Sequence, residues 1–119
     1  MPLHLHPMDS FGAEITGVTG AELAEPAAAE QCRAALDEYG VLIYRDLHIA
    51  DEDLVRFTRL LGDPMMSRTR EHRLGEIETI TLDPSKTDAV LASYRQGNFH
   101  WHIDGATLEI PQYRGGRLR

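Results

Sequence analysis

A histidine and an aspartate near the end of the chain have the residue types and spacing that could do chemistry. They lie in the run Asn98-Phe99-His100-Trp101-His102-Ile103-Asp104-Gly105. If this run is extended, His102 and Asp104 project from the same face, because side chains alternate along a strand. Imidazole nitrogen and carboxylate oxygen together suit Fe(II), and they supply two ligands of a 2-His-1-carboxylate triad. The third ligand must come from elsewhere, and an exposed His beside a turn Asp is the alternative interpretation.

Three other groups of residues could bind ligands or react, and each has a structural alternative. His4 and His6 would share one face of a strand and could hold a metal, or they could be a solvent-facing pair on an edge strand. A basic cluster in a loop could bind an anionic group of a substrate, or it could simply be solvated. Its members are Arg68, Arg70, His72 and Arg73. Cys32 is the only cysteine, and its place in an Ala-rich helical pattern indicates packing and not nucleophilic chemistry.

Length and charge exclude several classes of protein. A chain of 119 residues has room for one domain with a modest core. The net charge of -7 and the lack of a basic stripe predict that no nucleic acid is bound. The sequence has no apolar run of membrane-spanning length and no secretory signal at its start. With a single cysteine, these features predict a soluble cytoplasmic protein without a membrane partner.

Two segments carry the apolar periodicity of helices. Between Pro26 and Tyr39 apolar residues recur at helical spacing, and Gly40 suits the position just past the end. A second helix is predicted to begin at Asp51 and to end at residues 62–64, Gly-Asp-Pro. Its apolar face consists of Leu54, Phe57, Leu60 and Leu61. Acidic residues crowd its first turn, where they interact favourably with the helix dipole.

The remaining apolar segments predict short strands. The strand candidates are residues 3–6, 11–18, 41–44 and 77–82, and residues 90–94 are either a strand or the edge of a loop. Residues 41–44 form a continuous apolar run, which predicts a strand buried on both faces. Residues 65–75 lack periodicity and predict a polar loop, and residues 83–86 predict a turn.

Several of these segments, taken together and in order, resemble the N-terminal part of the TauD/TfdA family of dioxygenases, which use Fe(II) and 2-oxoglutarate. The matching segments are residues 12–18, 34–46, 57–64 and 101–105. The resemblance runs from Phe11 to Pro111. It implies an α+β fold that is the N-terminal part of a double-stranded β-helix, or jelly roll, with two helices flanking a mixed sheet. The family-like domain would take residues 1–112.

The resemblance also assigns roles to residues of the motif. It makes His102 and Asp104 two of the iron ligands. Asn98 lies where some relatives place an Asn that contacts the substrate, although a loop Asn is commonly a turn former. His100 shares the extended face of the two ligands, but the family does not rely on a His there. Trp101 would help to wall a pocket or would belong to the core, and Phe99 has the same two alternatives.

The implied reaction is the hydroxylation of a small, anionic organic substrate by O₂, with 2-oxoglutarate converted to succinate and CO₂. The protein's part in such cofactor chemistry is to bind, to orient and to keep the site dry. Relatives often associate, so a homo-oligomer is an expectation.

The family pattern continues where this chain does not. Relatives have a distal His as third iron ligand and an Arg that anchors 2-oxoglutarate, whereas residues 113–119 are basic, glycine-rich and divergent. Our hypothesis is a reading frame altered or truncated near Gln112, which leaves the barrel incomplete and this chain alone inactive. The alternative function is that of a non-catalytic remnant, which binds a partner through an exposed sheet edge.

Overall fold

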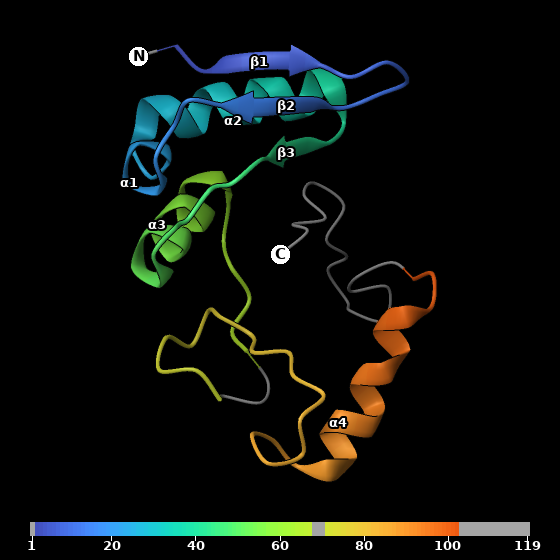
Figure 1. Ribbon diagram of the computed structural model, residues 1–119. Helices are drawn as coiled ribbons and strands as arrows, with labels where there is room; N and C mark the ends of the chain where they lie inside the picture. Colours follow the sequence, from blue (N-terminus) through green and yellow to red (C-terminus); the bar gives the residue numbers. More distant parts are fainter. Residues whose placement is uncertain (1, 68–70, 103–119) are drawn as a thin grey trace. The chain divides into compact units, whose positions relative to one another are not determined.

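The computed structural model describes residues 2–67 and 71–102, which divide into two compact units, residues 1–79 and 80–119 (Figure 1). The first unit has a small sheet with helices, in the order β1-β2-α1-α2-β3-α3. Within its described part, the second unit has one α-helix and a 3₁₀ turn. The elements are β1 His4–Pro7, β2 Ala13–Thr16, α1 Gly20–Leu23, α2 Pro26–Tyr39, β3 Leu42–Tyr44, α3 Asp51–Leu61, α4 Ala89–Arg95 and η1 Gln96–Phe99.

The sheet is mixed and has the strand order β1-β2-β3. β1 pairs antiparallel with β2 and places His6 opposite Glu14. β2 pairs parallel with β3 and places Ile15 opposite Tyr44. The two parallel strands need a long connection, which α1 and α2 supply. The strand prediction for residues 3–6 is confirmed over residues 4–6, although the strand includes Pro7 and not Leu3, and the one for residues 11–18 is confirmed over Ala13–Thr16.

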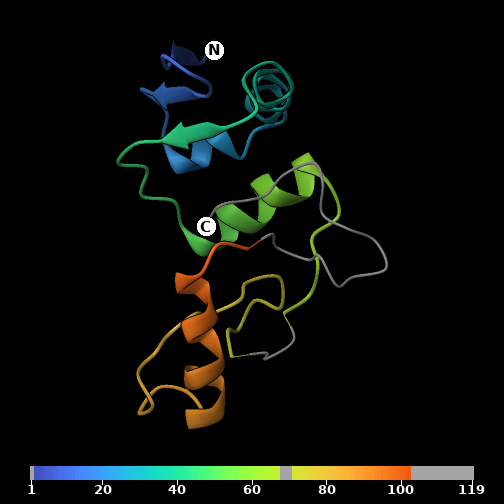
Figure 2. The same cartoon turned by 90° about the vertical axis from the view of Figure 1, so that its right-hand side faces the viewer.

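The predicted helix from Pro26 to Tyr39 is confirmed as α2, which runs along one face of the sheet in both ribbon views (Figures 1 and 2). Its buried residues are small: Ala28, Ala29, Cys32 and Ala35. Small side chains let a helix approach its neighbours closely. The helix stops at Gly40, whose φ of 78° favours glycine and whose N–H donates to the Leu36 carbonyl at 2.9 Å.

The core of the first unit joins the sheet to all three of its helices. Its buried members are Ile15, Leu23, Ala24, Ala29, Cys32 and Phe57. Phe57 comes from α3, and its ring meets the ring of Tyr44 edge to face, with centroids 6.1 Å apart. The predicted helix beginning at Asp51 is confirmed as α3, and it ends before Gly62. Val55 is also buried and extends the predicted apolar face.

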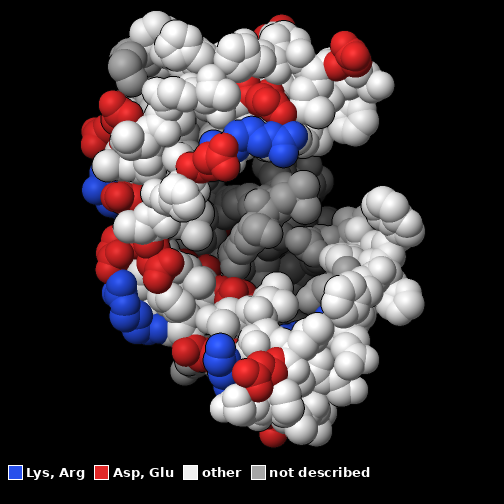
Figure 3. All heavy atoms as spheres, in the orientation of Figure 1, with Lys and Arg blue, Asp and Glu red and all other residues white. Residues whose placement is uncertain are grey.

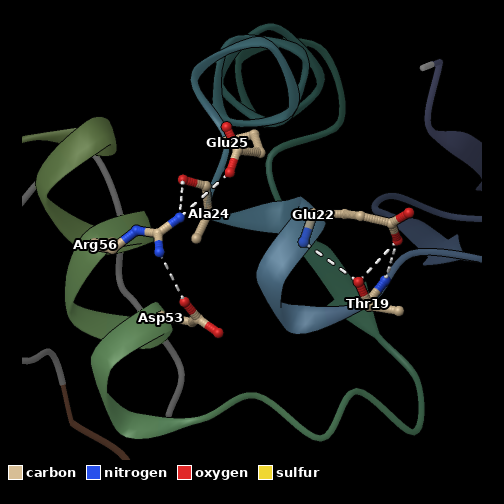
Figure 4. A network of polar contacts seen from close by, with 6 residues as sticks. All are labelled: Thr19, Glu22, Ala24, Glu25, Asp53 and Arg56. Carbon is tan, nitrogen blue, oxygen red and sulfur yellow. Dashed lines mark hydrogen bonds and ion pairs between the residues drawn. The ribbon is translucent and has the colours of Figure 1, made fainter.

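A second contact between helices is polar (Figure 4). The Arg56 guanidinium on α3 donates to the Ala24 carbonyl at 3.5 Å and lies 3.3 Å from a carboxylate oxygen of Glu25. Its other terminal nitrogen is 3.2 Å from Asp53. Arg56 therefore ties α3 to the turn between α1 and α2.

Two strand predictions differ from the structure. β3 is half-buried and not buried on both faces, and only β2 pairs with it among the described residues. Residues 77–82 form no strand, and the Ile77 N–H instead donates to the Leu74 carbonyl at 3.1 Å. An alternating pattern becomes a strand only where a neighbouring strand accepts its hydrogen bonds.

The prediction of a strand or loop edge at residues 90–94 is wrong, because these residues lie in helix α4. Asp88 begins this helix, and its carboxylate accepts hydrogen bonds from the backbone N–H of Val90 at 2.8 Å and of Leu91 at 3.3 Å. A short apolar run is compatible with either a strand or a helix, and the cap at Asp88 favours the helix. The predicted turn at residues 83–86 is confirmed by a hydrogen bond from Lys86 N–H to the Asp83 carbonyl, 3.0 Å.

Candidate functional site

The run that precedes the His-x-Asp motif is not extended throughout. Gln96–Phe99 forms the 3₁₀ turn η1, which the His100 N–H closes by donating to the Gly97 carbonyl at 3.0 Å. Extended backbone begins at His100, with φ -100° and ψ 149°. The prediction of an extended run is therefore wrong for Asn98 and Phe99, where Gly97 and Asn98 favour a turn.

His102 is held by the backbone two residues before it. Its ring nitrogen Nδ1 lies 2.7 Å from the His100 carbonyl oxygen. A carbonyl oxygen only accepts, so Nδ1 is the donor in this contact. Metal-bound histidines commonly donate their second ring nitrogen to a carbonyl in this way. The side chain of His102 is exposed.

The structure describes some of the other residues of the motif but not Asp104. Asp104 lies outside the described residues, so its convergence with His102 stays a prediction. Asn98 lies in η1, and its contact with a substrate also stays a prediction. The two aromatic residues are exposed, Phe99 by 78 % and Trp101 completely, so neither belongs to the core of the described structure. No described contact supports the expected pocket wall.

Two residues of the basic loop cluster contact the first turn of α3. His72 lies 3.0 Å from Asp51 through Nε2, and Arg73 forms an ion pair with Glu52. The Arg73 guanidinium is the main reason that the pKa of the Glu52 carboxyl is lowered. Arg68 and Arg70 lie outside the described residues. The two described members thus contact protein carboxylates, while the Arg73 side chain also stays 62 % exposed, so both anion binding and solvation of the cluster stay open.

Local sequence patterns do not predict this pairing, although a signal for it exists. Two acidic neighbours, Asp51 and Glu52, face two basic neighbours, His72 and Arg73. Acidic and basic side chains also lie next to one another on the face shown in Figure 3. Complementary charge pairs at two places in a sequence can indicate such a contact, but only together with a fold that brings them close.

Cys32 is fully buried, as the sequence predicted for a packing residue. Burial raises the pKa of its thiol, and a hydrogen bond with Tyr44 lowers it by less. Burial and the same hydrogen bond raise the pKa of the Tyr44 phenol. Both groups therefore stay protonated at neutral pH, so neither is a nucleophile in this state.

The described residues contain no preformed metal site with three protein ligands. Among residues 2–67 and 71–102, no three His, Cys, Asp or Glu side chains are placed to hold one ion. Within the same part of the chain, no helix has both the length and the apolar composition needed to cross a bilayer. The candidate metal site of the chain therefore remains the His-x-Asp motif that begins at His102.

A sequence profile described as "Taurine catabolism dioxygenase TauD, TfdA family" matches residues 2–113, which include His102 and Asp104. The chain belongs to the TauD/TfdA family. The family resemblance of the sequence is thereby confirmed over almost the whole chain.

Two individual relatives add detail. The chain is 27 % identical over 105 residues to the (S)-phenoxypropionate/alpha-ketoglutarate-dioxygenase of Sphingobium herbicidovorans, a match that covers 87 % of this chain and 36 % of that protein. The chain thus spans about a third of the length of this TauD/TfdA relative. A crystal structure of AAD-2 in complex with Mn(II) and N-oxalylglycine is similar with a TM-score of 0.48 and 25 % identity, covering 54 % of this chain and 26 % of that one.

Proposed function

We propose that this chain forms the N-terminal part of an Fe(II)- and 2-oxoglutarate-dependent dioxygenase. The observation that carries the proposal is the family match across residues 2–113, with the His-x-Asp motif inside it. In this proposal residues 1–112 are the first part of a double-stranded β-helix, and residues 113–119 are a divergent tail. The mixed sheet with its flanking helices is compatible with such a beginning.

His102 and Asp104 would hold the iron, with His102 binding through Nε2. The donor set fits the metal, because neutral imidazole and carboxylate are ligands that Fe(II) accepts. The His100 carbonyl supports this use of His102, since it fixes the proton on Nδ1 and so orients the ring. When bound, Fe(II) and 2-oxoglutarate would supply the oxidation of a substrate C–H bond by O₂, with release of succinate and CO₂.

The proposed substrate is a small organic anion. Support comes from the relative named for phenoxypropionate, which carries a carboxylate. Asn98 is the residue of this chain that we propose for substrate contact, since it lies four positions before His102 in the matched region. The family resemblance takes the third iron ligand and the 2-oxoglutarate anchor from a distal His and Arg, and this proposal assigns neither role to a residue of the present sequence.

An anaerobic titration with Fe(II) and 2-oxoglutarate tests the proposal. We expect a weak charge-transfer absorption in the visible range, lost in His102→Ala and in Asp104→Asn and retained in His48→Ala, an exposed histidine outside the motif. Succinate release under O₂ is a separate readout, and its presence would overturn the hypothesis that this chain alone is inactive. Absence of the absorption at millimolar iron would contradict iron binding by this chain and favour the non-catalytic binding module.

A further inference from the structure

Two exposed histidines on β1 form a second group with metal-ligating chemistry. His4 and His6 are two residues apart on the strand, so their side chains project from the same face. Leu5 between them is half-buried and packs against the core. β1 is an edge strand of the sheet (Figure 1), which confirms the prediction of a solvent-facing pair.

Both imidazole rings rest against the neighbouring strand and its end. Nε2 of His6 lies 2.9 Å from the Thr16 hydroxyl. Cδ2 of His4 lies 3.3 Å from the position that a Cβ of Gly17 would take, so this ring covers the glycine. The Thr16 hydroxyl can accept from Nε2–H, which leaves the Nδ1 lone pair of His6 for a metal. The two rings are therefore partly oriented before any ion binds.

The spacing of this pair suits chelation of one ion. Alternate residues of a strand have Cα atoms about 6.7 Å apart. Two cis nitrogens, each at about 2.0–2.1 Å from the metal, lie about 2.9 Å apart on a tetragonal ion and about 3.3 Å apart on a tetrahedral one, gaps that two converging imidazoles can match.

The charged groups around the pair do not supply a third ligand. Glu14 lies opposite His6 in the sheet, but its carboxylate is bound to Arg45 at 2.8 Å. No group of three metal-ligating side chains occurs anywhere in the described part of the chain. A bound ion would therefore have two protein ligands and water in its remaining positions.

We propose that His4 and His6 form a surface chelate for a late first-row divalent ion: Cu(II), and more weakly Ni(II) or Zn(II). Imidazole suits these ions, and the general order of affinity places Fe(II) well below them. This site is separate in sequence from His102 and Asp104 and does not depend on the proposed function. It matters for tests of that function, because copper or zinc bound at His4 and His6 would give no information about iron binding at His102 and Asp104.

Calorimetric titration of the untagged chain with Cu(II) or Zn(II) tests the chelate. Besides any ion bound at His102 and Asp104, we expect one bound equivalent whose affinity falls about tenfold or more in His4→Ala and in His6→Ala, since each variant leaves a single imidazole. The matched control His48→Ala and the motif variant His102→Ala should retain this equivalent. All four side chains are exposed, and far-UV circular dichroism checks that each variant is folded.

Paramagnetic broadening by Cu(II) locates the site in the unmodified chain. At substoichiometric Cu(II), the amide signals of Leu5, Thr16 and Gly17 should broaden first, while those near His48 stay sharp. The proposal is overturned if no ion binds below millimolar concentration. It is also overturned if His4→Ala and His6→Ala bind as tightly as the unmodified chain, or if broadening is confined to His100 and His102.

Discussion

The Cys32 thiol has no exposed surface, and burial raises its pKa. Because the thiolate is the reactive species, we expect native Cys32 to react with a chromogenic aromatic disulfide about a hundredfold more slowly than in urea. The measurement is the labelling rate at constant pH with and without denaturant. Tyr44→Phe removes the hydrogen bond that lowers the thiol pKa, so it should not speed native labelling. Equal rates in the native and unfolded chain would contradict a packing role.

Among the glycines that the structure describes, Gly20 has the closest backbone neighbour. A Cβ placed on it would lie 2.8 Å from the Ile49 Cα and 2.9 Å from Cγ1 of the same residue. Gly20→Ala should therefore lower the free energy of unfolding by about 1–3 kcal/mol, because backbone must move to admit the methyl group. Urea unfolding followed by circular dichroism measures this.

Gly97→Ala is the matched control for Gly20→Ala. A Cβ at Gly97 would meet no atom within 4 Å, and this glycine does not have a positive φ. Its substitution should leave the unfolding midpoint nearly unchanged. A loss as large as that of Gly20→Ala would show that crowding against Ile49 is not the cause.

Residue types alone predicted some individual roles and missed others. Burial of Cys32 follows from its helical spacing, and the exposed His4 and His6 follow from alternation on an edge strand. The contact of His72 with Asp51 could not be predicted in the same way, since 21 residues separate them. Such a contact depends on the path of a loop, which no local periodicity specifies.

At the scale of elements, α1 is short and depends on its cap. The Thr19 hydroxyl accepts from Glu22 N–H at 3.3 Å, and the Glu22 carboxylate accepts from Thr19 N–H at 2.8 Å (Figure 4). This reciprocal capping box satisfies backbone donors that the helix leaves unpaired. Thr19→Ala should lower the free energy of unfolding by about 1 kcal/mol, measured by urea denaturation.

The same box predicts a pH dependence. Hydrogen bonds from Thr19 lower the pKa of Glu22 below its usual value of 4.5. The folded state therefore binds the proton less readily, so this stabilisation is present above the unfolded pKa and is lost as pH falls through the folded one. The gap in unfolding midpoint between the unmodified chain and Glu22→Gln should narrow from pH 7 to about pH 3. Glu30→Gln, at an exposed position of α2, is the control for loss of one charge. A difference in unfolding midpoint that grows as the pH falls would contradict the predicted direction of the pH dependence.

Elements with long periodic patterns were predictable, and those that depend on partners were not. The bounds of α2 follow from Pro26, the apolar spacing and Gly40, and α3 follows in the same way from Asp51 to Gly62. Residues 77–82 alternate like a strand, yet strand formation requires a second strand. The proposed iron motif shows the same limit, because His102 and Asp104 are local in sequence while a triad needs a distant ligand.

At the scale of the whole molecule, the core cluster that the described residues form belongs to the first unit. Every member of the core cluster, from Ile15 to Phe57, belongs to residues 1–79. The sheet, α1, α2 and α3 belong to the same unit, as do the ion pairs that join residues 71–79 to α3. This unit therefore contains what a cooperative fold requires, namely a shared core and paired strands.

We expect a chain that ends at Thr79 to fold by itself. Its circular dichroism should show the helices of the first unit, and its urea unfolding should be a single cooperative transition, because burial of one core is gained or lost as a whole. Phe57→Ala in this shortened chain should lower the free energy of unfolding by about 3–5 kcal/mol, since it opens a cavity beside Ile15 and Tyr44. A gradual, non-cooperative transition would mean that residues beyond 79 are needed to assemble the core around Phe57. The same conclusion would follow if Phe57→Ala left the free energy of unfolding of the shortened chain unchanged.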